Sequence, residues 1–224
     1  MKIGNLHPWN VTAKQAIDIQ QRLSRQIISN DRLGNIAYIA GVDAGFERDG
    51  AITRAAVVIL EFPSLALMET SIARLPTNFP YIPGLLSFRE LPAILEAMTR
   101  LAQEPDLLIC DGQGVAHPRR IGIASHLGLL TGLPSIGVGK SRLIGAHDPV
   151  RDQTGAWEPL WDKGELIGAV VRTRKGVKPV YVSTGHKISL ETAISYVLAC
   201  TTRFKLPEAI RMAHHYASRV GVSG

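Results

Sequence analysis

The sequence predicts an α/β protein built on one mixed β-sheet with helices on both of its faces. Three strand-like segments joined by short links come first, and this order indicates an antiparallel meander. Short apolar strands then alternate with helices, which is the pattern that places strands in parallel. Hydrophobic residues make up 46% of the 224 residues and charged residues 20%, so the chain can bury a core and is not disordered.

The first half of the chain supplies the meander. Thr12-Ala13-Lys14-Gln15 has the spacing of a capping box and predicts the start of a helix whose apolar face carries Ile19 and Leu23. We expect strands over residues 36–42, 52–60 and 65–75, a turn at 62–64 and a helix over 90–103. Pro92 fits that helix only if it lies in the first turn.

The second half supplies the β-α alternation. Leu107-Leu108-Ile109-Cys110 is wholly apolar, as expected for a strand buried on both faces. We further expect a helix over 121–130, a strand over 135–138, a hairpin formed by 164–174 and 180–183, a helix over 189–200 and a last helix from Pro207. There is no repeat or linker, so we expect one domain over residues 1–224.

Several protein classes are excluded by composition. The longest aliphatic run, Ala55 to Leu60, is far shorter than the roughly 18 residues of a membrane span, so we expect no membrane partner. Residues 1–8 lack the apolar block of a signal peptide. Two cysteines, Cys110 and Cys200, form neither a disulfide framework nor a Cys-x-x-Cys metal site. We therefore expect a cytoplasmic protein.

The positive charge of the chain is concentrated in one segment. The net charge is +6, and residues 163–187 hold six basic residues against one acid, Glu165. Such a segment either contacts the phosphates of a nucleic acid or forms a hairpin whose charged face is solvated, and the residues leave both interpretations open.

Three acidic residues are candidates for a metal site. Asp43 and Asp111 each follow an apolar strand segment and come just before glycine-containing loops. Carboxylates at the ends of neighbouring strands meet in the crevice where α/β sites form, and they would bind Mg²⁺. Glu90, at the predicted start of a helix, would add a third ligand. Taken singly, each acid also fits an ordinary turn or helix-capping role.

A resemblance to the phosphate-binding P-loop is rejected. Gly137-Val138-Gly139-Lys140-Ser141 imitates the end of that motif, but the pattern requires glycine at position 134, where this chain has Pro134. A nucleoside triphosphatase is therefore not predicted. Lys140 still remains a candidate to contact a phosphate as a point charge.

Several ordered segments together resemble the endonuclease V family, the deoxyinosine 3′ endonucleases of DNA repair. The resemblance covers the chain from about the first helix to the helix start at Leu206-Pro207-Glu208. The segments are Gly41-Val42-Asp43-Ala44-Gly45-Phe46, Pro80-Tyr81-Ile82-Pro83-Gly84-Leu85-Leu86-Ser87-Phe88-Arg89-Glu90, Asp111-Gly112-Gln113-Gly114-Val115-Ala116-His117-Pro118-Arg119-Arg120, Ser135-Ile136-Gly137-Val138-Gly139-Lys140 and Thr184-Gly185-His186-Lys187.

The resemblance implies a ribonuclease H-like fold and a nuclease activity. The family's acidic triad falls on Asp43, Glu90 and Asp111, which would hold Mg²⁺, with Mn²⁺ as a substitute, and Lys140 joins them as a catalytic residue. The expected reaction is hydrolysis of the second phosphodiester bond 3′ to deoxyinosine, which leaves a 3′-hydroxyl and a 5′-phosphate. For His214, in the last helix, two interpretations stay open: it lies near the metal centre, or it is a helix histidine that faces solvent.

The resemblance also implies residues that contact DNA. Tyr81 matches the family's wedge residue, and Pro80 and Pro83 stiffen the backbone around it, so the ring can enter a base stack with little further ordering. The structural alternative is a tyrosine that packs on its own loop. The expected base pocket consists of Gly84, Leu85, Gly112, Gly122 and Leu143, and the expected phosphate contacts are His117, Arg119, Arg120, His186 and Lys187.

Two other functions fit the same residues. One is an endonuclease that cuts RNA at inosine, because no feature of the sequence reports a contact to the 2′-hydroxyl. The other is a nucleic-acid binding module without catalysis, which the complete acidic triad argues against. We expect a monomer whose partner is DNA that contains deoxyinosine, with other deaminated bases and inosine-containing RNA as further candidates.

Overall fold

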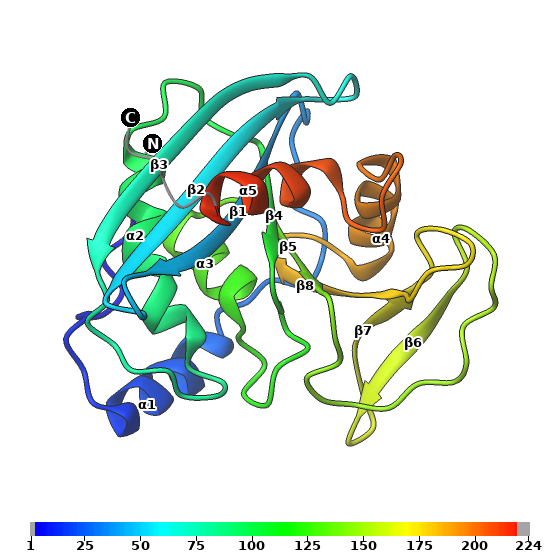
Figure 1. Cartoon of the computed structure of the whole chain (residues 1–224). Coiled ribbons are helices and arrows are strands. Elements are labelled where there is room, and N and C mark those ends of the chain that lie inside the picture. Colours follow the sequence, from blue (N-terminus) through cyan, green and yellow to red (C-terminus); the bar gives the residue numbers. More distant parts are fainter. Residues whose placement is uncertain (1–2, 219–224) are drawn as a thin grey trace.

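The computed structural model describes residues 3–218 and shows one eight-stranded sheet with helices around it (Figure 1). Its strands are β1 (Tyr38–Glu47), β2 (Ile52–Glu61), β3 (Leu67–Pro76), β4 (Leu107–Asp111), β5 (Ser135–Gly139), β6 (Trp157–Asp162), β7 (Glu165–Val171) and β8 (Val180–His186). Its helices are α1 (Ala13–Ser24), α2 (Leu86–Thr99), α3 (Ile123–Thr131), α4 (Leu190–Ala199) and α5 (Glu208–Ser218).

The sheet is mixed, as predicted. The strand order is β3-β2-β1-β4-β5-β8-β7-β6. β1, β2 and β3 form the antiparallel meander, and β4 lies parallel to both β1 and β5. The remaining pairs, β5 with β8, β8 with β7 and β7 with β6, are antiparallel. The parallel pairs bring the carboxyl end of β4 next to β1 at the centre of the sheet.

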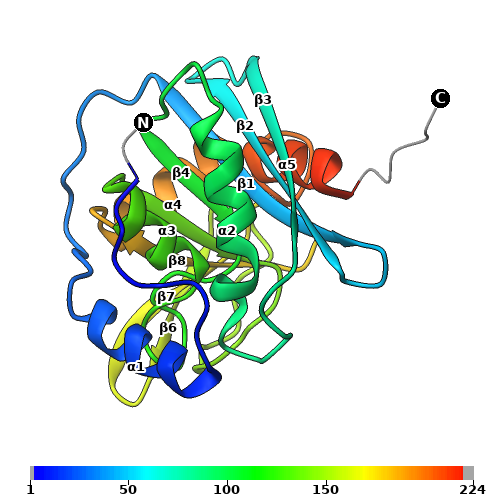
Figure 2. The ribbon, with the colours of Figure 1, turned by 90° about the vertical axis from the view of Figure 1, so that its left-hand side faces the viewer.

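Helices cover both faces of the sheet, with α2 and α3 on one side and α4 and α5 on the other (Figure 2). The alternation of side chains along β4 shows how the two cores form. Leu107 and Ile109 pack in the core beneath α4 and α5, whereas Leu108 and Cys110 pack in the core beneath α2 and α3. A strand buried on both faces needs an uninterrupted apolar run, which explains the composition of this segment.

Among the predicted boundaries, those of β1 and α2 differ most from the structure, and α2 also ends at Thr99 rather than at 103; one strand was missed. β1 continues to Glu47 because residues 44–47 pair with β2, so Asp43 projects from inside the strand. α2 begins at Leu86, which puts Pro92 beyond the first turn and Glu90 within the helix. β6 was not predicted. Its Pro159 needs no backbone donor because β6 is an edge strand.

Two findings concern the broader class of the protein. Both Cys110 and Cys200 are free and buried, and burial raises the pKa of each thiol. Within residues 3–218 every helix is too short or too polar to serve as a membrane span.

Candidate functional site

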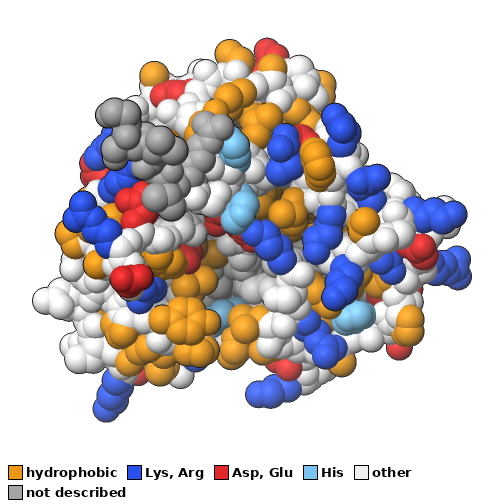
Figure 3. Space-filling model, viewed as in Figure 1, with side chains coloured by type: hydrophobic (Ala, Val, Ile, Leu, Met, Phe, Trp, Pro, Cys, Tyr) orange, Lys and Arg blue, Asp and Glu red, His pale blue; other side chains and the backbone are white. Residues whose placement is uncertain are grey.

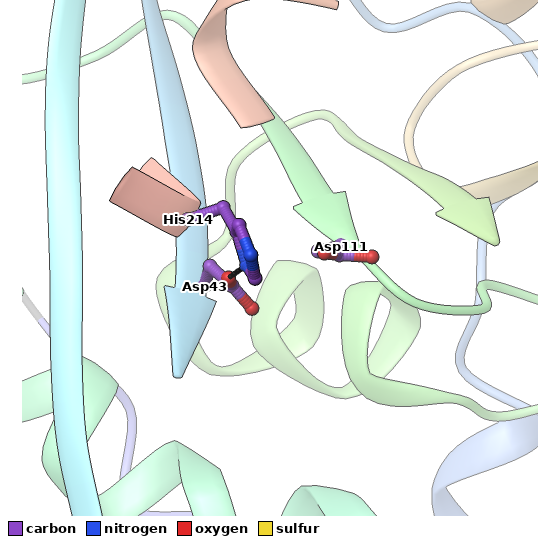
Figure 4. A group of neighbouring side chains, drawn as sticks. All are labelled: Asp43, Asp111 and His214. Carbon is purple, nitrogen blue, oxygen red and sulfur yellow. Dashed lines mark hydrogen bonds and ion pairs between the residues drawn. The ribbon is translucent and has the colours of Figure 1, made fainter. Parts of the chain in front are cut away.

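Two carboxylates and one imidazole from distant segments meet at one point. Asp43 on β1, Asp111 at the end of β4 and His214 on α5 place ligand atoms within 4.8 Å of one another (Figure 4). Nδ1 of His214 lies 2.7 Å from Oδ2 of Asp43. Both aspartate side chains are 12% exposed and the imidazole is 55% exposed, so solvent reaches the group from the side of α5.

Glu90 lies outside this close group but within range of its charges. The residue is on α2 and is 7% exposed. Burial, and then the charges of Asp43 and Asp111, raise the pKa of Glu90 well above its usual value, and the charge of Arg89 opposes this only in part. Burial and the charge of Asp111 also raise the pKa of Asp43. Burial therefore disfavours ionisation of Glu90 and Asp43, and repulsion from the neighbouring carboxylates adds to this effect.

One cation of the protein reaches this group. Nζ of Lys140 forms an ion pair with Oδ2 of Asp111, and the lysine side chain remains 41% exposed. β5 ends just before it, so the strand lies inside the sequence that imitates a P-loop, whereas a true P-loop follows its strand. On the face shown in Figure 3, histidine, acidic and basic side chains gather beside a hollow, and Lys and Arg side chains extend from it to the right.

A pocket of about 230 Å³ lies next to Asp111, because the following residue, Gly112, is part of its lining. Its walls come from the Tyr81 loop (residues 77–85), the start of α2, the β4–α3 loop (residues 112–122) with the start of α3, and residues 141–143, and Gln20 of α1 also lines it. Tyr81 lies at this pocket and is 69% exposed. Four of the predicted base-pocket residues line it, namely Gly84, Gly112, Gly122 and Leu143. The fifth, Leu85, is buried in the small core formed with Ala16, Phe79 and Phe88.

The backbone donors of the pocket are not equally available. The N–H groups of Leu85, Gly112 and Gly122 donate to carbonyl oxygens of Ile82, Val138 and Gly114, respectively. No hydrogen bond described over residues 3–218 uses the N–H of Gly84 or of Leu143. These two are the predicted residues that keep a backbone donor for a ligand.

Two predicted phosphate contacts hold the Tyr81 loop. The carbonyl oxygen of Gly84 accepts hydrogen bonds from Nε2 of His117 at 3.0 Å and from Nη2 of Arg119 at 2.6 Å. Burial and the charge of Arg119 lower the pKa of His117 to about 4, so its imidazole is neutral and donates through Nε2. Gly84 has φ 78°, and a Cβ there would lie 2.8 Å from Nη2 of Arg119, so only glycine permits this contact.

The other predicted phosphate contacts have partners within the protein. Arg120 forms ion pairs with Asp162 at 2.8 Å and with Glu165 at 2.7 Å, which tie the β6–β7 turn to the β4–α3 loop. His186 is buried and accepts from the N–H of Ile28 through Nδ1, and Nζ of Lys187 donates to the carbonyl of Gly132. A phosphate contact by any of these three stays a prediction.

The sequence did not reveal a buried polar network beneath the start of α2. Nε2 of His7 lies 2.7 Å from Nε2 of His126, whose Nδ1 lies 3.0 Å from Oγ of Ser87. Because Nδ1 of His7 must donate to the carbonyl of Pro8, its Nε2 accepts from His126, and Nδ1 of His126 accepts from Ser87. The one signal in the sequence is a histidine within an apolar helix, which does not identify its partners.

Known proteins resemble this chain over nearly its whole length. The family model described as endonuclease V matches residues 21–215. A protein of Trichormus variabilis named endonuclease V is 58% identical over 219 residues, which is 97% of this chain and 99% of the relative. The crystal structure of the endonuclease V from Streptomyces avermitilis superposes with a TM-score of 0.89 at 36% identity and covers 97% of this chain and 96% of that one.

The protein in one solved complex with DNA is also similar to this chain. The complex contains the endonuclease V of Ciona intestinalis with a 23mer DNA in which an inosine is followed by a ribo-adenosine. The protein in that complex has a TM-score of 0.82 to this chain at 29% identity, covering 92% of this chain and 97% of that one.

Proposed function

The chain belongs to the endonuclease V family of nucleases, and on this premise we propose that it is a DNA repair endonuclease that recognises deoxyinosine. It hydrolyses the second phosphodiester bond on the 3′ side of the lesion and leaves a 3′-hydroxyl and a 5′-phosphate. The observation that carries the proposal is the convergence of Asp43, Asp111 and His214 beside a pocket with Tyr81 at its edge. The inosine-containing DNA in the Ciona intestinalis complex supports the choice of substrate.

The residues at this point fit a divalent cation, which membership of the family implies. The donors are two carboxylates and an imidazole, with a third carboxyl group on Glu90 nearby. Burial, and then the charges of the neighbouring carboxylates, raise the pKa values of Asp43 and Glu90, and a bound cation would favour the ionised forms of both groups. We propose Mg²⁺ as the physiological ion and Mn²⁺ as its substitute, because both accept oxygen ligands in octahedral sites.

The protein's contribution to the reaction is position and charge. Asp43 and Asp111 would hold the divalent cation, which would supply positive charge to polarise the scissile phosphate and to make water a better nucleophile. Glu90 is buried within range of the charges of Asp43 and Asp111, so whether it holds a proton depends on the charge of that group. Lys140 places a positive charge beside Asp111 and neutralises part of the charge that develops on the phosphate.

Lesion recognition takes place in the pocket of about 230 Å³. Tyr81 enters the base stack and fills the gap that the extruded hypoxanthine leaves. Hypoxanthine presents a carbonyl acceptor and an N1–H donor but no exocyclic amine. The unused N–H groups of Gly84 and Leu143 fit its carbonyl, and the neutral partners of Arg119 leave that residue's positive charge available to a nearby phosphate.

The test is to incubate an end-labelled duplex that contains one deoxyinosine with the protein and Mg²⁺ and to map the product to one nucleotide. The proposal requires a single cut at the second phosphodiester 3′ to the lesion, absent without metal and absent from the unmodified duplex. Asp43→Ala and Asp111→Ala should still bind the lesion duplex without cutting it. Retention of binding with no cleavage by the wild-type protein would identify a binding module instead.

A second substrate is favoured by the ribo-adenosine that follows the inosine in the Ciona intestinalis complex. The same assay should therefore include three substrates of one sequence: all DNA, DNA with one ribonucleotide after the inosine, and all RNA. Faster cleavage of the all-RNA substrate would make the chain an inosine-directed ribonuclease on the same fold.

We also propose that the protein acts as a single catalytic domain and a monomer, and that it is cytoplasmic. The continuous sheet supports a single domain, and the two free cysteines support a reducing compartment such as the cytoplasm. Light scattering after size exclusion would test the oligomeric state.

A further inference from the structure

Helix α1 carries a glutamine where its packing pattern calls for an apolar residue. The buried side chains of α1 are Ala16, Gln20 and Leu23, which share one face, and Gln20 is 1% exposed. A leucine at this position would complete the apolar face. A buried polar side chain instead requires partners, because an unpaired amide in this place costs free energy.

The amide of Gln20 is paired at both ends. Its Oε1 accepts from Nε of Arg119 at 2.5 Å. Its Nε2 lies 3.0 Å from the carbonyl oxygen of Gly84 and 3.4 Å from that of Ile121. These partners fix the orientation of the amide, since the nitrogen faces carbonyl oxygens and the oxygen faces a guanidinium.

The partners of Gln20 belong to two different walls of the pocket. Gly84 lies in the Tyr81 loop, whereas Arg119 and Ile121 lie in the β4–α3 loop. Arg119 also donates to the carbonyl of Gly84, so Gln20, Gly84 and Arg119 form a closed cycle of hydrogen bonds. Gln20 connects both walls from a helix that contributes none of the acidic residues.

We propose that Gln20 is a positioning residue that sets the separation of the two pocket walls, so that capture of the extruded base depends on helix α1. The inference rests on the proposed function, because it names what shapes the lesion pocket. Loss of the amide leaves the Nε–H of Arg119 and the carbonyl of Ile121 without these partners. The hydrogen bonds from His117 and Arg119 to the carbonyl of Gly84 remain, but the Arg119 guanidinium loses the acceptor that orients it, so the separation of the two loops is no longer fixed. The acidic group, held by β1, β4 and α5, keeps its geometry.

The test compares Gln20→Met, which keeps the length of the side chain, with Gln21→Met, its exposed neighbour on the same helix. Single-turnover cleavage of a deoxyinosine duplex is measured over a range of protein concentrations. For Gln20→Met we expect the half-saturating concentration to rise about tenfold or more, with the maximal rate nearly unchanged. Gln21→Met should match the wild type.

A second measurement needs no substrate. Amide hydrogen exchange of residues 81–86 and 117–122 should quicken in Gln20→Met, while exchange in β1 and β4 stays constant. If Gln20→Met does not fold, Gln20→Glu serves in its place. It keeps the acceptor toward Arg119 but puts a carboxylate oxygen against the carbonyl oxygens of Gly84 and Ile121, where the wild type has a donor. Its half-saturating concentration and the exchange of both loops should rise relative to the wild type.

Two outcomes would overturn the proposal. One is unchanged half-saturation together with unchanged exchange of both loops, and the other is a fall in maximal rate alone. A wild-type protein that does not prefer deoxyinosine would refute the proposed function instead, and the exchange measurement would still decide whether Gln20 holds the two loops.

Discussion

Glu90 is a buried carboxyl group that faces two others. Burial and the charges of Asp43 and Asp111 raise its pKa, so in the metal-free protein the folded state keeps a proton that the unfolded state releases. The ionisable group therefore costs stability increasingly as the pH rises above the usual carboxyl range. We expect Glu90→Gln to raise the thermal midpoint of the metal-free protein at about pH 8 and to change it little near pH 4.

Scanning calorimetry of protein treated with a chelator checks this expectation. Added Mn²⁺ should reduce the difference in thermal midpoint between Glu90→Gln and the wild type, because a cation favours ionised Glu90. Glu96→Gln, on the exposed side of the same helix, is the control and should show a small change at every pH. A lower midpoint for Glu90→Gln at alkaline pH would contradict the account.

Residues of the site differ in how far the sequence reveals them. Asp43 and Asp111 could be predicted because each follows an apolar strand, and resemblance supplied the match of Glu90 to the triad. Gln20 and Ser87 could not, because each acts through a partner far along the chain, 101 positions away for Gln20 with Ile121 and 39 positions away for Ser87 with His126. Such pairs become visible only in the folded protein.

At the scale of elements, the Tyr81 loop presents an exposed ring between two prolines. Tyr81 is 69% exposed, and the loop is held by hydrogen bonds to Gly84 rather than by packing of the ring. We expect Tyr81→Ala to weaken binding to a deoxyinosine duplex about tenfold or more, because stacking on a base is worth roughly 1–3 kcal/mol. Binding to the unmodified duplex should change much less.

Fluorescence anisotropy with both duplexes measures this difference directly. Tyr81→Phe keeps the ring and should bind nearly as the wild type does. Equal losses on the two duplexes would make Tyr81 a structural residue of its loop.

The N-terminal segment is joined to α2 and α3 by the neutral pair His7 and His126. Burial lowers the pKa of His126 to about 3 and also lowers that of His7. Because the unfolded chain binds protons that the folded pair rejects, the free energy of unfolding should fall as the pH drops from about 6.5 toward about 3. The stabilisation is complete above the usual histidine pKa.

Urea denaturation at several pH values tests whether the free energy of unfolding falls on acidification. We expect His126→Gln to be less stable near neutral pH and to lose less stability on acidification than the wild type does. His215→Gln, an exposed histidine on α5, should keep the wild-type pH dependence. If the free energy of unfolding of His126→Gln depends on pH as steeply as that of the wild type, the pair of His7 and His126 is not the cause of the pH dependence.

The boundaries of elements were harder to predict than their existence. The apolar pattern around Ile39 and Val42 indicated β1, but its extension to Glu47 depends on pairing with β2. α2 starts at Leu86 because Ser87 and Phe88 are buried against neighbours distant in the chain. Long-range contacts of this kind extend elements beyond the point where local preference ends.

At the scale of the whole molecule, the close approach of α5 to β1 assembles the site. A Cβ added at Gly41 would lie 2.0 Å from the carbonyl oxygen of Ala209, so the helix rests directly on the strand backbone. We expect Gly41→Ala to destabilise the protein by at least about 2 kcal/mol and to move His214 away from Asp43. Gly34→Ala, whose Cβ meets nothing within 4 Å, should stay within about 0.5 kcal/mol of the wild type.

Denaturant unfolding of both glycine variants gives the comparison. A stable Gly41→Ala protein with normal cleavage would show that the contact between α5 and β1 is not required for the site.

The global arrangement was predictable to the extent that strand order follows from local pattern. The meander and the alternating segments indicated a mixed sheet with helices on both faces, and the structure confirms it. The position of α5 was not predictable from pattern alone, since it depends on glycines that any turn or strand also accommodates. The resemblance, rather than periodicity, indicated that His214 lies near the acids.

If Asp43 and Asp111, brought together by β1 and β4, hold a catalytic divalent cation, removal of either carboxylate must weaken metal binding. Titration with Mn²⁺, followed by the paramagnetic signal of the free ion, measures this directly in the wild type, Asp43→Asn and Asp111→Asn. The account predicts that each variant binds Mn²⁺ at least about tenfold more weakly and loses cleavage while it still binds the lesion duplex. Wild-type affinity for Mn²⁺ in both variants would contradict it.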